Sequence, residues 1–162
     1  MKRAREKILS HKELCDVCIN FKKQGLKIVF TNGCFDLLHV GHLRYLEEAK
    51  ELGDALVVGV NSDRSVREIK GENRPIIPQL ARAELIAGLW CVDYVTIFDD
   101  ITPLSLIKAV KPDILVKGAD WNLSEIVGRD FVESYGGRVH RIELTPGFST
   151  TLIIQSVLKQ HA

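Results

Sequence analysis

The sequence lacks the features that define several classes of protein. Nowhere do about eighteen apolar residues follow one another, as a membrane span requires. The N-terminal stretch MKRAREKILSHKELCDVC has no apolar core of signal-peptide length. The formal net charge is +1, from 22 basic and 21 acidic side chains, and this balance provides no bulk field that would draw the protein onto nucleic acid or an anionic membrane. We therefore expect a soluble, cytoplasmic protein with neither nucleic acid nor membrane as a partner.

Cysteine is also scarce, with four residues in a chain of 162. A chain of this length buries enough surface to need no disulfide framework, so Cys15, Cys18, Cys34 and Cys91 are interpreted as free thiols. Cys15 and Cys18 form a CxxC pair with His11 just upstream, which raises the alternative of a metal or redox site. Because no second ligand pair lies nearby, buried or half-buried thiols on an N-terminal helix are favoured.

What the sequence does contain is a regular alternation of apolar segments and helical patterns. With 46% hydrophobic and 27% charged residues, it is globular in composition. Its length predicts one domain over 1–162, with residues 1–25 as an N-terminal helical extension. The predicted strands are 27–31, 55–61, 94–98, 114–117 and 138–144. The predicted helices are 10–23, 39–51, 63–69, 79–89, 103–110, 125–135 and 150–159. The alternation predicts an α/β fold, a parallel sheet of about five strands with helices on both faces.

One stretch, TNGCFDLLHVGH at 31–42, places two of the five histidines directly after the first predicted strand. In open α/β sheets, ligands bind outside the carboxyl ends of the strands. Gly33 allows a tight turn there, and a helix beginning near His39 offers unpaired N–H groups and a positive dipole end. His39 and His42 share one face of its first turn, and Gly41 keeps bulk away from them. The stretch predicts a phosphate site.

The same stretch has three other chemical interpretations. In a structural interpretation, one histidine caps the helix while the other packs, but two on one face of a first turn fit this less well. A dinucleotide site is disfavoured, because the turn contains no GxGxxG. A metal site would need a third ligand, for which Asp36 is the nearby candidate. Phosphate is favoured over metal, since the glycine turn and the helix N-terminus add donors that metal ligation does not need.

The same region carries a resemblance to a known family. GCFDLLHVGHLRYLEEAKELGD, followed by VVGVNSD, resembles the HxGH nucleotidyltransferases of the cytidylyltransferase-like superfamily, whose domains are Rossmann-like. NSDRSVREIKGENRPIIP, ILVKGADW and GFSTTLI extend the resemblance to bacterial D-glycero-D-manno-heptose 1-phosphate adenylyltransferases, over about 29–158. Two departures are GADW at 118–121, where the family often has GGDY, and Phe148 before Ser-Thr-Thr. These departures concern the fit of the sugar rather than the reaction.

The resemblance implies an enzyme that transfers AMP from ATP to the heptose 1-phosphate for the lipopolysaccharide core. It also implies Mg²⁺ with the ATP, and a homodimer. In this family a heptose kinase is often fused in front, and this chain has no room for one. We therefore expect a stand-alone adenylyltransferase that receives its sugar phosphate from a separate kinase.

Candidate site residues fall into three groups. The expected catalytic residues are His39, His42 and Lys117, which ends a strand at the carboxyl edge. Those expected to bind the nucleotide or its phosphates are Thr31, Asn32, Gly33, Cys34, Phe35, Asp36, Gly41, Ser149, Thr150 and Thr151. Candidates for the substrate or for the loop at 70–78 are Asn61, Asp63, Lys70, Arg74, Arg82, Gly118 and Asp120.

Several of these residues also have a structural interpretation. The basic loop candidates are alternatively solvated surface residues, and Asn61 and Asp63 alternatively brace the loop. At least one residue of Ser149 to Thr151 is expected to cap the last helix. The resemblance implies that this turn is a second phosphate-binding element and that Asp36 lies close to the reacting phosphates or their metal.

Two alternative functions remain open on the sequence. A cytidylyltransferase acting on glycerol phosphate or a similar alcohol phosphate would usually carry an RTxGISTT turn, and here LTPGFSTT lacks the arginine. A non-catalytic nucleotide-binding module would not require both histidines, Lys117 and the Ser-Thr-Thr turn together. An adenylyltransferase is therefore favoured over both.

Overall fold

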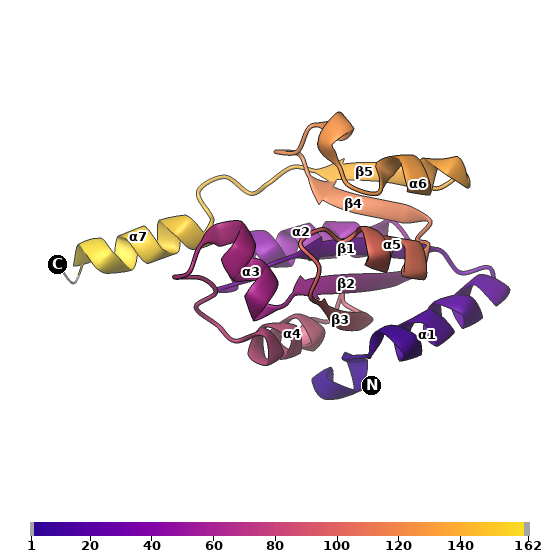
Figure 1. The fold of residues 1–162 in the computed structure, drawn as a ribbon, viewed down its shortest axis with the longest axis horizontal. Helices are drawn as coiled ribbons and strands as arrows, with labels where there is room; N and C mark the ends of the chain where they lie inside the picture. Colours follow the sequence, from indigo (N-terminus) through magenta and orange to yellow (C-terminus); the bar gives the residue numbers. More distant parts are fainter. Residues whose placement is uncertain (1, 161–162) are drawn as a thin grey trace.

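The computed structural model describes residues 2–160, and its five strands form one parallel sheet in the order β3-β2-β1-β4-β5 (Figure 1). The strands are β1 Ile28–Gly33, β2 Ala55–Asn61, β3 Tyr94–Phe98, β4 Ile114–Gly118 and β5 Arg138–Ile142. Every predicted strand is present, with ends that differ by at most two residues. The predicted α/β class is therefore confirmed.

Helices connect the strands, as the alternation predicts. The α-helices are α1 His11–Lys23, α2 Val40–Glu51, α3 Asp63–Lys70, α4 Gln79–Gly88, α5 Leu104–Val110, α6 Arg129–Ser134 and α7 Thr150–Gln160; two short 3₁₀ helices are η1 Ala4–Lys7 and η2 Leu123–Glu125. The prediction for 125–135 was wrong at its start. Gly128 has φ +90°, outside the helical region, and separates η2 from α6. Within residues 2–160, no helix combines the length and apolar character needed to cross a membrane.

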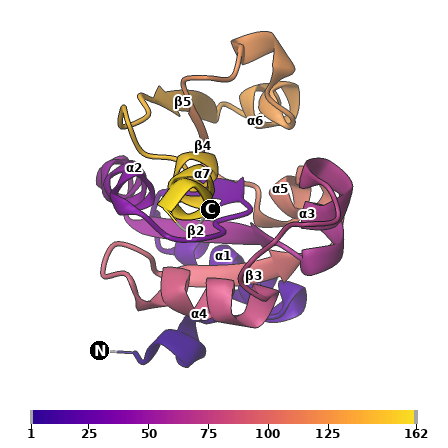
Figure 2. The ribbon, with the colours of Figure 1, turned by 90° about the vertical axis from the view of Figure 1, so that its left-hand side faces the viewer.

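The helices cover both faces of the sheet, because neighbouring residues of each strand point to opposite faces. Val29 of β1 packs in one core layer with residues of α2 and α4. Ile28 and Phe30 pack in the other layer with residues of α1, α5 and α6. Figure 2 shows the sheet nearly edge-on, with α2 on one side and α5 and α6 on the other. Helix α1, within the predicted extension 1–25, therefore contributes to the core.

The order of the strands reverses between β1 and β4. Strand β1 pairs with β2 over six residue pairs, up to Gly33 with Val60. Its pairing with β4 covers two pairs, Val29 with Ile114 and Phe30 with Leu115. Beyond these pairs, towards the carboxyl ends, the two strands are no longer joined by the ladder. This is the topological switch point at which open α/β sheets bind ligands. Helix α7 extends away from the body at this end of the sheet (Figure 1).

Candidate functional site

A pocket of about 650 Å³ opens at the carboxyl ends of the strands. It is lined by the turn after β1, the start of α2, the end of α3, and the segments that follow β3, β4 and β5. All but three of the residues predicted for the site line it. They are Asn32, Gly33, Cys34, Phe35, Asp36, His39, Gly41, His42, Asn61, Lys70, Arg74, Lys117, Gly118, Asp120, Ser149, Thr150 and Thr151. The structure thus brings residues from distant parts of the chain to one cavity.

The two histidines lie at the start of α2 with their rings stacked, centroids 3.9 Å apart. His39 is the N-cap residue, but its side chain makes no capping hydrogen bond. Gly41 allows this arrangement, because an added Cβ would come within 3.0 Å of the His39 ring. Both Nδ1 atoms are buried and have no hydrogen-bond partner among the described residues. Buried polar atoms normally have partners, so these nitrogens and the uncapped helix end indicate a site for polar ligand atoms.

Burial keeps the histidine pair neutral. Burial, with a smaller contribution from the neighbouring His39, lowers the pKa of His42 to about 4. Burial also lowers the pKa of His39 below its ordinary value. At neutral pH both rings are therefore uncharged imidazoles. Each can donate one N–H to a phosphate oxygen without placing two like charges against each other.

Lys117 lies at the end of β4, across the switch point from β1. Its ammonium group donates a hydrogen bond to the Asn32 side-chain oxygen of β1. Burial lowers the pKa of Lys117 to about 8, against a smaller opposing contribution from Asp120. The pocket therefore holds a cation at neutral pH, and this cation is positioned between the two strands that frame it.

The Ser-Thr-Thr turn opens α7 at the rim of the pocket. Gly147 has φ +81°, which glycine adopts without strain, and this reverses the chain just before the helix. The Ser149 Oγ accepts a hydrogen bond from the Leu152 N–H at 3.1 Å, so Ser149 caps α7 as predicted for one of these residues. Because Ser149 supplies the cap, Thr150 and Thr151 are not needed for it and line the pocket.

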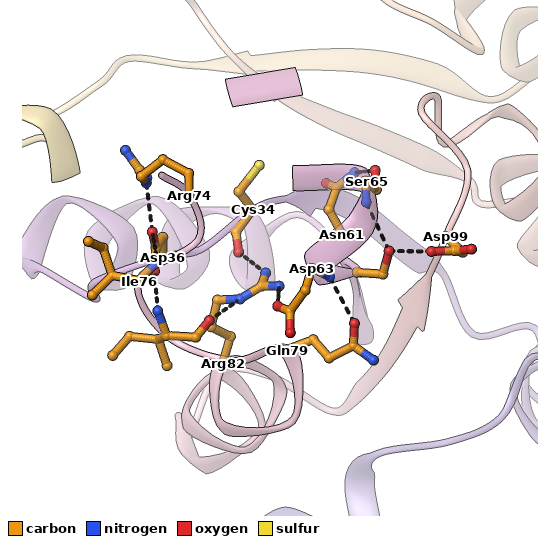
Figure 3. Close-up of polar contacts among 12 residues, drawn as sticks. Cys34, Asp36, Asn61, Asp63, Ser65, Arg74, Ile76, Gln79, Arg82 and Asp99 are labelled. Atoms are coloured by element: carbon orange, nitrogen blue, oxygen red, sulfur yellow. Dashed lines mark hydrogen bonds and ion pairs between the residues drawn. The ribbon is translucent and has the colours of Figure 1, made fainter. Parts of the chain in front are cut away.

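Asp36 lines the pocket and its carboxylate binds protein groups. That it lies close to the reacting phosphates or their metal stays a prediction. Its buried carboxylate accepts hydrogen bonds from Arg74 Nε at 2.7 Å and from the N–H groups of Ile76 and Ile77 at 2.8 and 2.9 Å (Figure 3). Burial alone would raise the pKa of Asp36, but these donors outweigh it and hold the pKa below its ordinary value. Asp36 thus anchors the loop between α3 and α4 to the turn after β1.

Three predicted residues do not line the pocket, and each has a protein partner instead. The Thr31 hydroxyl is buried against the Tyr45 hydroxyl at 2.7 Å. Arg82 is fully buried and donates to the Asp63 carboxylate at 2.8 Å. These placements favour the structural interpretation of Asp63 as a brace, and the ligand contacts expected of Thr31 and Arg82 stay predictions.

The remaining candidates differ in how they are held. Asn61 is buried and its amide donates to Ser65 Oγ at 2.9 Å. Lys70 lines the pocket from the end of α3, and Gly118 and Asp120 line it from the end of β4 and the segment that follows.

Sequence reasoning missed the contribution of the segment after β3. Ile101, Thr102 and Pro103 line the pocket, together with the exposed aromatic side chains of Trp121 and Phe148. Ligands bind at the carboxyl ends of strands, and this rule applies equally to β3. The position of Ile101, Thr102 and Pro103 after β3 could therefore have indicated that they line the pocket. The two aromatic residues stand at the positions where the sequence departs from the family pattern.

The CxxC pair lies on α1, outside the residues that line this pocket. Cys18 is buried in the core and Cys15 is half-buried, both as free thiols. The His11 ring lies 3.0 Å from the Ile97 carbonyl, to which Nε2–H donates. Within residues 2–160, no three His, Cys, Asp or Glu side chains form a group that could hold a metal ion.

Comparison with known proteins places these features in a family. The sequence model of the cytidylyltransferase-like family matches residues 30–156. The bifunctional protein HldE of Syntrophotalea carbinolica is 53% identical over 96% of this chain, which spans only 32% of that relative. A lipopolysaccharide core biosynthesis protein from Thermoplasma volcanium is 33% identical, with a TM-score of 0.62 over 74% of this chain and 97% of the other.

A more distant structure supports the fold alone. Pantoate-beta-alanine ligase from Francisella tularensis is 15% identical, with a TM-score of 0.57 over 96% of this chain and 78% of its own. The Rossmann-like fold and the superfamily implied by the HxGH stretch are therefore confirmed. The chain belongs to the cytidylyltransferase-like family.

Proposed function

We propose that the chain transfers AMP from ATP to D-glycero-D-manno-heptose 1-phosphate, releasing pyrophosphate and forming ADP-heptose for the lipopolysaccharide core. The observation that carries the proposal is the pocket itself, where His39 and His42, Lys117 and the Ser149–Thr151 turn meet at the switch point. The motifs shared with heptose 1-phosphate adenylyltransferases support the substrate pair. The similarity to a lipopolysaccharide core biosynthesis protein supports the pathway.

The reaction requires positioning and charge neutralisation more than proton transfer. A phosphate monoester has a second pKa of about 6, so the sugar phosphate is largely dianionic at neutral pH and attacks the α-phosphorus without a general base. Neutral His39 and His42 would donate to the phosphate oxygens as charge develops on them. Lys117 would neutralise charge from the opposite side of the switch point, and Thr150 and Thr151 would hold the triphosphate from the rim.

Magnesium enters this proposal as part of the substrate, MgATP. The pocket carboxylate of Asp36 is engaged by three protein donors, and no three described His, Cys, Asp or Glu side chains form a group that could hold a metal ion. The ion would be held mainly by phosphate oxygens and water, as Mg²⁺ with nucleotides commonly is. When bound, it would supply further neutralisation of the triphosphate.

The proposal also includes the biological setting. A heptose kinase would supply the sugar 1-phosphate, and the reaction would take place in the cytoplasm. We further propose that the protein acts as a homodimer, as the family resemblance implies.

A panel of nucleotides and acceptors tests the proposed reaction. With Mg²⁺ and the heptose 1-phosphate, pyrophosphate release should be far faster with ATP than with CTP, because the chain lacks the arginine-containing turn of the cytidylyltransferases. The measurement is initial rate for each nucleotide with heptose 1-phosphate or glycerol 3-phosphate. Faster turnover with CTP and glycerol 3-phosphate would assign the chain to the cytidylyltransferases. Nucleotide binding without turnover on any acceptor would identify a non-catalytic module.

Replacing Thr150 by Val tests the second phosphate-binding turn. The change keeps the shape of the side chain and removes its hydroxyl, and Ser149 already supplies the helix cap. We expect slower turnover with an almost unchanged melting temperature. Ser149→Ala is the matched comparison, because loss of a cap lowers stability by about 1 kcal/mol. Normal turnover per folded Thr150→Val molecule would show that this hydroxyl does not hold a phosphate.

A further inference from the structure

Arg82 joins three segments of the chain beneath the pocket without reaching the pocket itself. From α4, its Nε donates to the Ile77 carbonyl at 2.8 Å, and its terminal nitrogens donate to the Cys34 carbonyl and to the Asp63 carboxylate (Figure 3). The side chain is fully buried. Any effect of Arg82 on the reaction must therefore pass through the groups that it holds.

The backbone between the Cys34 carbonyl and Asp36 is in an unfavourable conformation. Phe35 has φ +45°, in the left-handed region that a bulky side chain rarely adopts. On one side, the Cys34 carbonyl is held by Arg82. On the other side, the Asp36 carboxylate is held by the N–H groups of Ile76 and Ile77. The conformation of Phe35 is thus imposed by its surroundings rather than by its own preference.

The Phe35 ring in turn supports the histidine pair. It lies over Gly33, where an added Cβ would come within 3.1 Å of the ring. It also packs edge-on against the His42 ring, with centroids 5.5 Å apart. His42 stacks on His39. A continuous set of contacts therefore leads from the buried guanidinium to the imidazoles.

We propose that Arg82 is a positioning residue for nucleotidyl transfer, because it keeps Phe35 in the left-handed conformation from which the aromatic ring orients His42. The inference rests on the proposed function, since it assigns Arg82 to the same reaction. Its consequence is that α4, although none of its residues lines the pocket, sets the geometry of the catalytic turn.

The test compares Arg82→Met with Lys22→Met in the full chain. Arg82→Met should lower kcat by about a hundredfold with little change in KM for ATP, because a small displacement of a catalytic group has effects of this size. Lys22 also donates to two backbone carbonyls, those of Val110 and Lys111 at 3.0 and 2.5 Å, and it does not line the pocket. Lys22→Met should lose stability while kcat per folded molecule stays at the parent value.

Two further variants make the inference independent of how well Arg82→Met folds. Arg82→Lys keeps one cation that can reach one carbonyl, so its kcat should be intermediate. In a Phe35→Leu background, Arg82→Met should lower kcat by much less than in the parent, because both changes disturb the same contacts, those that lead through the Phe35 ring to His42. A parent kcat in Arg82→Lys, or independent losses in the double variant, would overturn the inference.

A spectroscopic measurement separates this inference from the proposed function. The side-chain NMR resonances of His42 should shift in Arg82→Met and Arg82→Lys but not in Lys22→Met. If the parent protein shows no nucleotidyl transfer, the proposed function fails, and these resonances still decide whether Arg82 orients His42. Unchanged His42 resonances in both Arg82 variants would overturn the positioning role.

Discussion

His39→Ala and His42→Ala should each lower kcat by roughly a hundredfold to a thousandfold, with smaller changes in KM. Removal of one preorganised donor from a charge-stabilising site typically has an effect of this size, near 3 to 4 kcal/mol. The effect should fall on kcat, because the proposed contacts would strengthen as the α-phosphorus becomes five-coordinate, whereas uniform ground-state contacts would mainly change KM. The measurement is steady-state kinetics of pyrophosphate release with saturating sugar phosphate.

The stacked arrangement adds a second expectation for the double variant. Two donors that serve one group of oxygens are non-additive, so the double alanine variant should lose less than the product of the single losses. His→Asn keeps an uncharged donor of shorter reach, and partial recovery would indicate hydrogen bonding. His11→Ala is the matched control, because His11 contacts the Ile97 carbonyl away from the pocket. If either alanine variant turns over at the parent rate, that histidine is a packing or capping residue.

Lys117→Met should lower kcat/KM by roughly a hundredfold to a thousandfold, as expected for a charged donor beside the transferring phosphate. The parent enzyme should also show a characteristic dependence on pH. Because burial lowers the pKa of Lys117 to about 8, the residue is protonated below that pH and loses its charge above it. The kcat/KM of the parent should therefore be level on the neutral side and decline above about pH 8, since this ratio reports the free enzyme.

Substitution of Lys117 by arginine tests whether loss of the Lys117 charge causes the decline of kcat/KM at alkaline pH. Arginine stays charged above pH 12, so Lys117→Arg should lack the decline near pH 8, even if its larger side chain lowers the plateau. Lys108→Met, on the exposed side of α5, serves as the control and should keep the parent profile. An alkaline decline that persists in Lys117→Arg would assign it to a different group.

Local signals in the sequence were enough to predict the elements and the place of the site. Apolar segments rich in Val and Ile located all five strands. The signal is clearest for β1 and β2, because these strands are buried along most of their length. The glycine turn and the paired histidines located the pocket, because both lie within one short stretch. The start of α6 was missed because a single residue, Gly128, interrupts an otherwise helical pattern.

The hydrogen bonds that Arg82 and Asp36 make beneath the pocket could not be predicted from local signals in the sequence. Arginine is mostly exposed in proteins, and nothing near Arg82 in the sequence indicates that its partners include the carbonyl of Cys34, 48 positions away. Asp36 likewise binds backbone groups of a loop about 40 positions further along the chain. Such bonds depend on how the loop between α3 and α4 returns to the sheet, which residue types and spacing do not specify.

Because the pairing between β1 and β4 is short, a bound nucleotide would stabilise the sheet at this point. The ladder joins these strands over two residue pairs, and further along, Lys117 reaches across to Asn32. A triphosphate held by the turn after β1 and by Lys117 would bridge the same gap as a cross-brace between the two halves of the sheet. A ligand that binds only the folded state stabilises it by roughly 2.7 kcal/mol at a hundred times its Kd. Bound in this way, the substrate would reinforce the sheet where the backbone ladder is shortest.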